Sequence, residues 1–390
     1  MFVCVDDPTE LKSASGIFAR SMLAALGSFG VVQLLVVPGL PNHRRWRRRL
    51  NQALSLLRCR SALEGTVDQA GIRKELLRLA NESPGRPIFL NHLRSACFLA
   101  RYTETLPAQI VYVAQNSEAE SARSLSELPS NPLNRWVLRR EARMIANLEA
   151  RVSTKAAHVL TLTDEDAARF RTTCPVTCLP PLLELESMPS PDFGRRADEA
   201  TLALISSFHW TPKRWNAYWV VEEVMPLVWA KLPQTRLLIV GAGADKLGIK
   251  HESVSVEADV ADIRPYYNLA DVILVPDRQS SGLKFKTVQA ALAGKAIVST
   301  PPGIEGTALH DGESVLVRAS AEGFSQAILQ LLSDCNFRTR LGRRAEAIAR
   351  ERFSHARILK LFGAFLEELQ AVAATPQTQH DTVSREAPLA

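Results

Sequence analysis

Apolar runs alternate with amphipathic stretches along the first half of the chain. Consecutive apolar residues, each run long enough for one buried strand, lie at 1–5, 31–37, 87–91, 110–116 and 158–163. Residues 16–28 and 135–153 instead repeat apolar side chains at helical spacing, and the stripe of the second comprises Leu138, Ala142, Ile145, Leu148 and Val152. Strands that alternate with helices predict a parallel, doubly wound α/β sheet.

Prolines and mixed charge interrupt the pattern, and we assign a linker to residues 184–199. The alternation then restarts, with strands expected at 202–207, 236–240, 253–256, 271–276 and 296–300, helices at 215–231 and 285–293, and three more helical stretches up to residue 372. The sequence therefore predicts two Rossmann-like domains, 1–183 and 200–355, that face a central cleft where open sheets bind ligands.

The end of the chain divides into an apolar helix and a polar tail. A helix over 356–372 carries an apolar stripe that needs a covering surface, formed by Ile358, Leu361, Phe362, Phe365, Leu366 and Leu369. Residues 373–390 lack an apolar period and are predicted to be disordered.

Composition and charge narrow the class of protein. The chain has 390 residues, 46% hydrophobic and 23% charged, which is typical of a soluble two-domain enzyme. The net charge of +6 favours anionic partners, either nucleotide phosphates, lipid headgroups or nucleic acid. Six scattered cysteines without a CxxC pair indicate reduced thiols and no metal site, and the opening "MFVCVDDPTE" is unlike a signal peptide, so we expect a cytoplasmic protein.

The stretch "SGLKFKTVQAALAG", 281–294, has the features of an anion site at a helix start. It follows the apolar run "DVILVP", so a strand end, a loop with Ser280, Ser281 and Gly282, and a helix come in that order. Unpaired N–H groups at a helix start attract phosphate, and a glycine lets the backbone approach it. Lys284 and Lys286 can add charge, although on their own they also fit a solvated helix start.

Residues 275–306, "VPDRQSSGLKFKTVQAALAGKAIVSTPPGIEG", resemble the retaining GT-B glycosyltransferases of glycosyl transferases group 1, in particular those of bacterial polysaccharide synthesis. The resemblance covers nearly all of residues 200–370. It is looser in the N-terminal half, where "ASGIFARSMLAAL", "NHLRS", "YVAQNSEAES" and residues 138–167 match the family's loops and interdomain-facing helix.

The resemblance implies a reaction and its participants. A sugar would pass from a nucleotide diphosphate donor, with retention of configuration, to a cell-envelope glycan, a lipid-linked sugar or another acceptor, with no cofactor and no bound metal. Lysines and helix N-termini would stabilise the leaving diphosphate. The helix at 356–372 would cross back to the N-terminal domain.

The resemblance also assigns roles to particular residues. The donor-binding residues would be Gly16, Lys213, Ser280, Ser281, Gly282, Lys284, Lys286, Thr287 and Gln289, and the catalytic residues Gln115, Lys286 and His92. Gly16 is equally well explained as a helix-entry glycine, Lys213 also fits a solvated turn, and a lone histidine after a strand, such as His92, is more often structural.

Three residues depart from the family pattern. Gln289 replaces a glutamate that holds the nucleotide ribose, Ser281 replaces a second acidic residue, and Gln115 replaces a histidine near the donor. Glutamine can hydrogen-bond hydroxyls but carries no negative charge. A catalytically weak or inactive GT-B protein that binds a nucleotide or a partner in a glycan assembly complex therefore stays open as an alternative.

A basic stretch, "NHRRWRRRLNQALSLLRCR" (42–60), suits the anionic face of a membrane. The residues expected to contact the membrane or a lipid-linked acceptor are Arg44, Arg45, Trp46, Arg47 and Arg48. A solvated basic helix is the alternative, and no RNA-binding motif supports nucleic acid as a partner. We therefore expect a cytoplasmic protein that can associate peripherally with the inner face of the membrane.

Overall fold

The computed structural model describes residues 1–5, 7–8, 14–37, 60–82, 84–101, 108–127, 131–170, 175–183, 200–278 and 282–374. Outside the described residues lie the predicted linker (184–199), the tail beyond residue 374, Ser280 and Ser281, and the proposed membrane-contact residues Arg44, Arg45, Trp46, Arg47 and Arg48.

The N-terminal domain is built on a six-stranded parallel sheet with the order β2-β1-β3-β4-β5-β6. Its strands are β1 (Phe2–Cys4), β2 (Leu34–Val36), β3 (Ile88–Asn91), β4 (Ile110–Ala114), β5 (His158–Thr161) and β6 (Val176–Cys178). Strand β1, next to the edge strand β2, pairs in register with both neighbours, Phe2 opposite Leu34 of β2 and opposite Phe89 of β3. Strands β1, β3, β4 and β5 are buried along their whole length, which explains why their sequences are mostly apolar.

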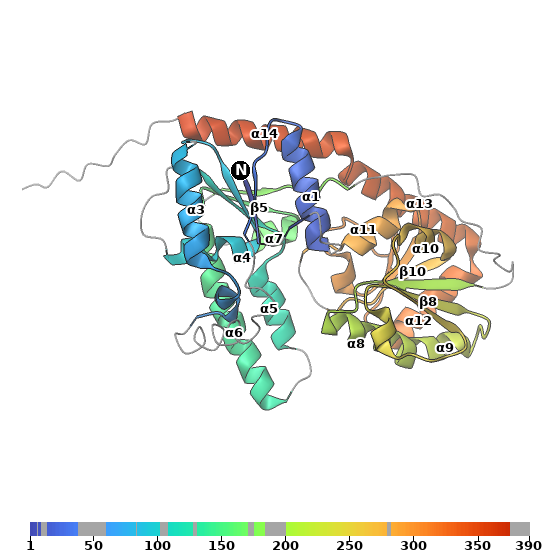
Figure 1. The fold of residues 1–390 in the computed structure, drawn as a ribbon. Coiled ribbons are helices and arrows are strands. Elements are labelled where there is room, and N and C mark those ends of the chain that lie inside the picture. Colours follow the sequence, from blue (N-terminus) through green and yellow to red (C-terminus); the bar gives the residue numbers. More distant parts are fainter. Residues whose placement is uncertain are drawn as a thin grey trace, which may run out of the picture.

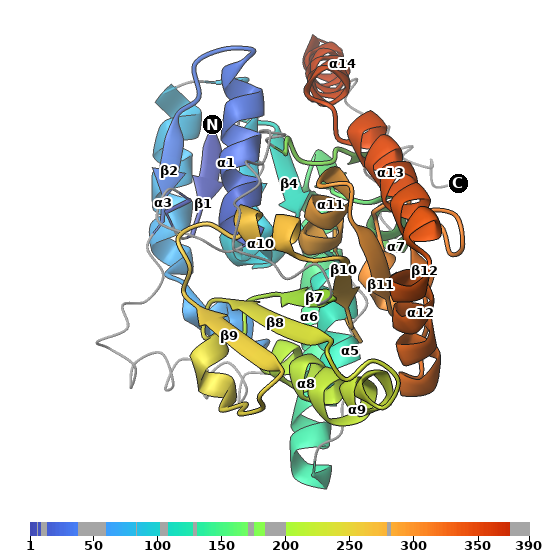
Figure 2. The ribbon, with the colours of Figure 1, turned by 90° about the vertical axis from the view of Figure 1, so that its right-hand side faces the viewer.

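Helices lie on both faces of this sheet (Figure 1). They are α1 (Ala14–Gly27), η2 (Ala62–Thr66), α3 (Gln69–Glu82), α4 (His92–Ala96), η3 (Cys97–Arg101), α5 (Glu118–Ser126), α6 (Pro132–Lys155) and α7 (Asp164–Arg169). The predicted helices 16–28 and 135–153 correspond to α1 and α6. The first turns of α6 project beyond the rest of the domain (Figures 1 and 2).

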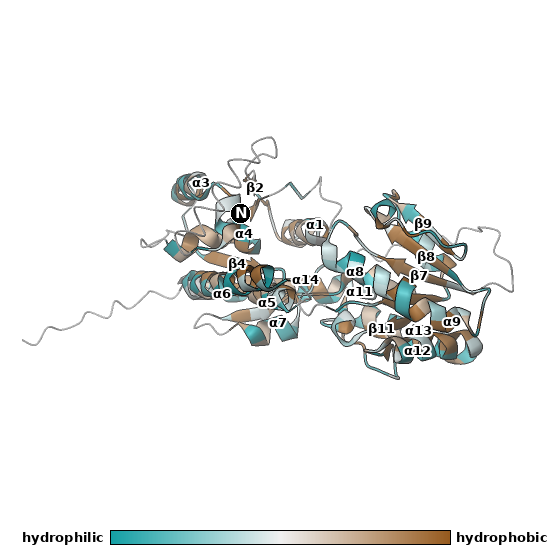
Figure 3. Ribbon diagram, turned by 90° about the horizontal axis from the view of Figure 1, so that it is seen from below, coloured by the Kyte–Doolittle hydropathy of each residue, from teal (hydrophilic) through white to brown (hydrophobic). Residues whose placement is uncertain are grey.

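The C-terminal domain has a second six-stranded parallel sheet, with the order β12-β11-β10-β7-β8-β9. Its strands are β7 (Thr201–Ile205), β8 (Arg236–Gly241), β9 (Val254–Ala258), β10 (Val272–Val275), β11 (Ala296–Ser299) and β12 (Leu316–Val317). Apolar residues concentrate on the strands, and polar ones on the outer sides of the helices (Figure 3). The prediction of two parallel, doubly wound sheets is confirmed.

The helices of this domain are α8 (Thr211–Trp219), η4 (Val220–Val224), α9 (Met225–Trp229), η5 (Ala244–Leu247), α10 (Arg264–Leu269), α11 (Phe285–Leu292), η6 (Pro301–Ile304), α12 (Ala321–Ser333) and α13 (Cys335–Arg352). The single helix predicted over 215–231 is interrupted by a π-helical turn, η4. Pro226 follows this turn and has no N–H to continue the helical ladder, which explains the interruption.

The last helix, α14 (His355–Ala374), continues from α13 and lies along the N-terminal domain (Figures 1 and 2). Phe365 packs edge-on against Phe89 of β3, with ring centroids 6.4 Å apart, and against His158 of β5 at 4.8 Å. The Gln109 side-chain amide donates to the Leu369 carbonyl over 3.1 Å. The apolar stripe of α14 is thus buried at Ile358, Phe362, Phe365 and Leu369, whereas Leu361, predicted as part of the stripe, is exposed. No helix among the described residues is long and apolar enough to cross a membrane.

Candidate functional site

The loop after β10 meets the loop after β4 at Gly282. Gly282 has a φ of 67°, and a Cβ atom placed on it would lie 2.9 Å from the Asn116 Cβ and 3.4 Å from the Gln115 carbonyl oxygen. Both the left-handed backbone and the close approach therefore favour glycine. The sequence predicted a close approach at Gly282, and its neighbour in the structure is the opposite domain.

Lys286 lies in the first turn of α11 without a carboxylate partner among the described residues. Its ammonium donates to Gln289 Oε1 over 3.2 Å. Burial, and to a smaller extent the positive charge of Lys213, lower the pKa of Lys286 to about 8. An anion at this helix start would therefore supply the missing counter-charge.

Gln289 is fixed by its carbonyl oxygen. Besides the Lys286 ammonium, the hydroxyl of the buried Tyr267 lies 3.5 Å from the same Oε1 atom. With the oxygen engaged on this side, the side-chain NH₂ group is the part of Gln289 left to donate to a ligand. Because the glutamine is neutral, it leaves the charge of Lys286 uncompensated, which a glutamate in its place would not do.

Lys213 and Asp277 form an ion pair at the carboxyl ends of the neighbouring strands β7 and β10. The Lys213 ammonium lies 2.5 Å from both carboxylate oxygens of Asp277, and the Asn216 amide donates to one of them over 3.3 Å. Burial tends to raise the pKa of Asp277, but Lys213 and Lys284 hold it below its usual value. Lys213, expected at the donor diphosphate, is thus bound to a carboxylate that our sequence analysis missed, although an acidic residue directly after a buried strand was a visible signal.

Lys284 and Thr287 lie on either side of Lys286 in the sequence and have different environments. Lys284 precedes α11 as its N-cap residue, and burial lowers its pKa against the opposing effect of Asp277. Thr287 is fully buried, and its hydroxyl donates to the Gly303 carbonyl over 2.7 Å. We therefore assign the side chain of Thr287 to anchoring α11 on η6 rather than to ligand contact.

On the N-terminal side, Gln115 and His92 are held by polar neighbours. The Gln115 amide donates to Asn91 Oδ1 over 3.0 Å. His92 Nδ1 accepts from the Arg94 N–H over 3.2 Å, and His92 Nε2 lies 2.9 Å from Glu118 Oε1. Both ring nitrogens are engaged, so His92 would have to release Glu118 before it could serve an acceptor hydroxyl.

The backbone of His92 is strained. Its φ of 73° is one of three positive values among the described residues other than glycine, and such conformations cluster at functional sites. Gly16 shows no such feature. It is the buried third residue of α1, which agrees with a helix-entry position, while residues 9–13 before the helix lie outside the described residues.

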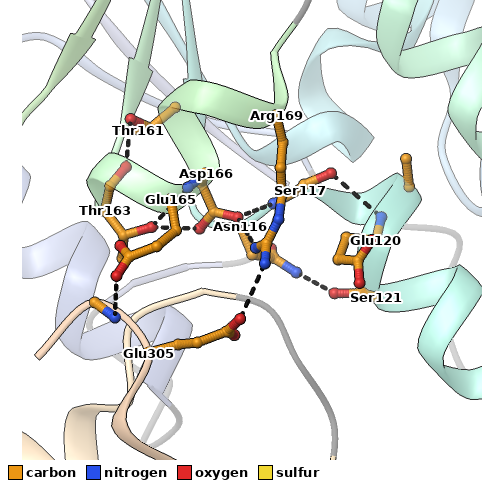
Figure 4. Close-up of polar contacts among 12 residues, drawn as sticks. Asn116, Ser117, Glu120, Ser121, Thr161, Thr163, Glu165, Asp166, Arg169 and Glu305 are labelled. Atoms are coloured by element: carbon orange, nitrogen blue, oxygen red, sulfur yellow. Dashed lines mark hydrogen bonds and ion pairs between the residues drawn. The ribbon is translucent and has the colours of Figure 1, made fainter. Parts of the chain in front are cut away.

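A polar network joins the domains next to these loops (Figure 4). Arg169 of α7 donates to Asp166 over 3.1 Å and, across the interface, to Glu305 over 2.9 Å. The Gly306 N–H donates to Glu165 over 3.3 Å. These contacts, which the sequence did not predict, bring the loops after β5 and β11 together beside those after β4 and β10.

Glu149 of α6 positions the loop that carries Gln115. Its carboxylate accepts from the backbone N–H groups of Glu118 over 2.8 Å and Ala119 over 3.2 Å, and from the Ser117 hydroxyl over 3.1 Å. Burial raises the pKa of Glu149 to about 7. The sequence offers only a weak signal for this role, namely a carboxylate between the apolar Leu148 and Val152 in a helix.

Comparison with known sequences places the C-terminal domain in a family. Residues 199–334 match the profile described as Glycosyl transferases group 1, so the resemblance drawn from the sequence is confirmed there. A comparison with curated protein sequences finds no match.

Solved structures with the same fold cover nearly the whole chain. Sucrose-phosphate synthase from Thermosynechococcus elongatus matches with a TM-score of 0.70 and 15% identity over 95% of this chain and 98% of its own. HepE from Anabaena, solved with UDP and glucose, has a TM-score of 0.63 and 14% identity over 94% and 98%. The pneumococcal O-GlcNAc transferase GtfA, solved with UDP and GlcNAc, has a TM-score of 0.54 and 16% identity over 78% and 61%. The fold is therefore that of GT-B glycosyltransferases.

Proposed function

Because the chain has the GT-B fold and its C-terminal domain belongs to glycosyl transferases group 1, we propose that it transfers a sugar, with retention of configuration, from a nucleotide diphosphate donor to a cell-envelope glycan, a lipid-linked sugar or another acceptor. Two similar structures were solved with UDP, so uridine nucleotides are the first donors to test.

The observation that carries the proposal is the environment of Lys286. A half-buried ammonium at the start of α11, without a carboxylate partner among the described residues, is suited to a diphosphate. Negative charge grows on the leaving diphosphate as the bond to the sugar breaks, so a fixed positive charge stabilises the transition state more than the bound donor. We assign Lys286 to this role and the NH₂ group of Gln289 to a ribose hydroxyl.

Lys213 is less available to the donor than Lys286 is. Its bonds to Asp277 compete with any bond to a phosphate oxygen, so Lys213 reaches the donor only by giving up part of that contact. Lys284 and Lys213 both lie in the field of Asp277, which reduces the net positive charge on this side of the site.

A catalytically weak or inactive nucleotide-binding protein is the second candidate. Two observations favour it. Gln115, which stands where related sequences have a histidine, is hydrogen-bonded to Asn91, and Lys213 forms an ion pair with Asp277. Such a protein would bind nucleotide but neither transfer the sugar nor hydrolyse the donor.

Calorimetry with nucleoside diphosphates and a donor-hydrolysis assay separate the two candidates. In an active enzyme, Lys286→Ala should weaken donor binding and lower single-turnover transfer or hydrolysis by about one to two decades, because it removes one charge-assisted contact. Lys231→Ala is the matched control, because Lys231 is exposed after α9, whose buried residues belong to the core on the opposite face of the sheet from α11. Nucleotide binding without turnover would favour the second candidate, and an unchanged Lys286→Ala variant would remove the diphosphate assignment.

Contact with an anionic membrane through Arg44, Arg45, Trp46, Arg47 and Arg48 is a separate proposal, supported by sequence alone. Replacing the four arginines with glutamine should release the protein from phosphatidylglycerol vesicles while nucleotide binding persists, since each basic residue near such a surface contributes on the order of 1 kcal/mol. Equal vesicle binding by both forms would contradict it.

A further inference from the structure

A groove of about 660 Å³ lies between α5, α6 and α7 of the N-terminal domain. These three helices lie close together (Figure 3). The charged side chains that line the groove are the four guanidinium groups of Arg123, Arg139, Arg143 and Arg169 and the two carboxylates of Glu120 and Glu127. Positive charge therefore exceeds negative charge in the lining.

The two carboxylates are both paired with one arginine. Arg123 pairs with Glu120 at 2.6 Å and with Glu127 at 2.7 Å. Arg139 and Arg143, in contrast, make no hydrogen bond or ion pair within the described part of the chain. One helical turn separates them, so their side chains leave α6 on the same face, roughly 6 Å apart at their bases. The groove thus presents two adjacent guanidinium groups without a counter-charge.

The groove reaches the place where the two domains meet. At its inner end, Arg169 is bonded to Glu305 of the C-terminal domain over 2.9 Å (Figure 4). Ser117, also in the lining, directly follows Asn116, the residue that faces Gly282. A ligand in the groove would therefore lie on the N-terminal side of the loops that we assign to the donor.

A second hollow of about 380 Å³ continues outward along α6. It shares Arg139 and Arg143 with the first and adds Arg135, Trp136 and Arg140. The Trp136 side chain is 64% exposed, so an apolar surface borders the arginines on the projecting end of the helix.

We propose that this groove binds a phosphate or pyrophosphate group carried by the acceptor, with Arg139 and Arg143 as its principal ligands. Each guanidinium offers parallel N–H donors that match two oxygens of a phosphate, and two such groups on one helix face suit a doubly charged anion. This assignment of the acceptor rests on the proposed function. The phosphate could belong to a lipid carrier or to a water-soluble acceptor, and the chemistry of the site is the same for both.

The test uses the full chain and inorganic pyrophosphate as the probe, titrated by calorimetry at roughly 150 mM salt so that weak surface attraction is screened. A Lys286→Ala background keeps the probe from binding at α11. The double variant Arg139→Gln/Arg143→Gln should lower pyrophosphate affinity more than tenfold. Arg151→Gln, an exposed arginine of the same helix outside the lining, is the control and should leave affinity within twofold.

Two further measurements identify the source of the phosphate and separate this proposal from the donor assignment. If the acceptor is lipid-linked, farnesyl pyrophosphate should bind more tightly than inorganic pyrophosphate, since Trp136 can contact the isoprenoid chain. If the acceptor is water-soluble, the two probes should bind equally. In the wild-type background, the double variant should keep its UDP affinity. Equal pyrophosphate affinity in the double variant and the control overturns the groove site, whereas absent UDP binding with intact pyrophosphate binding overturns the proposed function and leaves the anion site standing.

Discussion

The low pKa of Lys286 predicts that donor affinity falls with pH in a range where an ordinary lysine does not titrate. Burial and the nearby charge of Lys213 lower the pKa of Lys286 to about 8, compared with an ordinary value of about 10.4. If only the ammonium form holds the diphosphate, the apparent dissociation constant is inversely proportional to the protonated fraction of Lys286. The free protein is then mostly competent at pH 7 and mostly incompetent at pH 9.

The size of the effect follows from this pKa. With a pKa of about 8, affinity for UDP-glucose should drop about tenfold between pH 7 and pH 9, whereas a lysine with an ordinary pKa would change it by only a few per cent. Both phosphates of the nucleotide sugar stay ionised over this range, so the donor diphosphate adds no titration of its own. Calorimetry at half-unit pH steps would measure the curve.

Lys286→Arg is the matched variant because a guanidinium stays charged throughout the range. It should bind UDP-glucose with a nearly flat pH profile, and any residual slope reports the uracil base or other groups. A wild-type profile as flat as that of Lys286→Arg would refute the reasoning, either because Lys286 has an ordinary pKa or because it does not contact the diphosphate.

The same displaced pKa predicts an opposite effect on stability. The folded state binds the Lys286 proton more weakly than the unfolded state does, so between about pH 8 and pH 10 the free energy of unfolding should rise with pH through this group. Below pH 8 the charged lysine destabilises the unliganded fold by its full amount, and Lys286→Met should raise the free energy of unfolding there by on the order of 1 to 3 kcal/mol. Urea unfolding at pH 7 without ligand measures this, and a destabilised methionine variant would contradict it.

Three further variants test other parts of the structure. Gln289→Glu places a carboxylate beside Lys286, so it should raise the lysine pKa and flatten the pH profile of donor binding, and it should weaken nucleotide affinity because it removes the NH₂ donor and compensates the lysine charge; an unchanged profile would contradict the contact. Asp277→Asn removes the charge paired with Lys213, and we expect a loss of about 1 to 3 kcal/mol of stability in urea together with equal or tighter donor binding, whereas weaker binding would show that Asp277 orients Lys213 for the donor. Phe365→Ala deletes the ring that packs on Phe89 and should cost about 3 to 5 kcal/mol, and a cost below about 1 kcal/mol would mean that α14 does not hold the N-terminal domain.

The local sequence determined the helices and strands and much of the proposed donor site around Lys286. Strands such as β4 and β10 are buried on both faces, so every residue in them must be apolar, and the pattern is readable without knowing their neighbours. The order of strand end, glycine loop, lysines and helix start around Lys286 is likewise local. It indicated an anion site because the unpaired N–H groups belong to the helix itself.

Tertiary structure decided which charges remain available. Lys213 and Lys286 look alike in the sequence, but Lys213 meets Asp277, 64 residues away, whereas the side-chain partner of Lys286 among the described residues is a neutral glutamine on its own helix. The interdomain contact between Arg169 and Glu305 spans 136 residues. Helical and strand periodicity reports which face of an element is buried, whereas the pKa and the role of a charge depend on the groups that folding places within a few ångströms of it, and those lie on other elements.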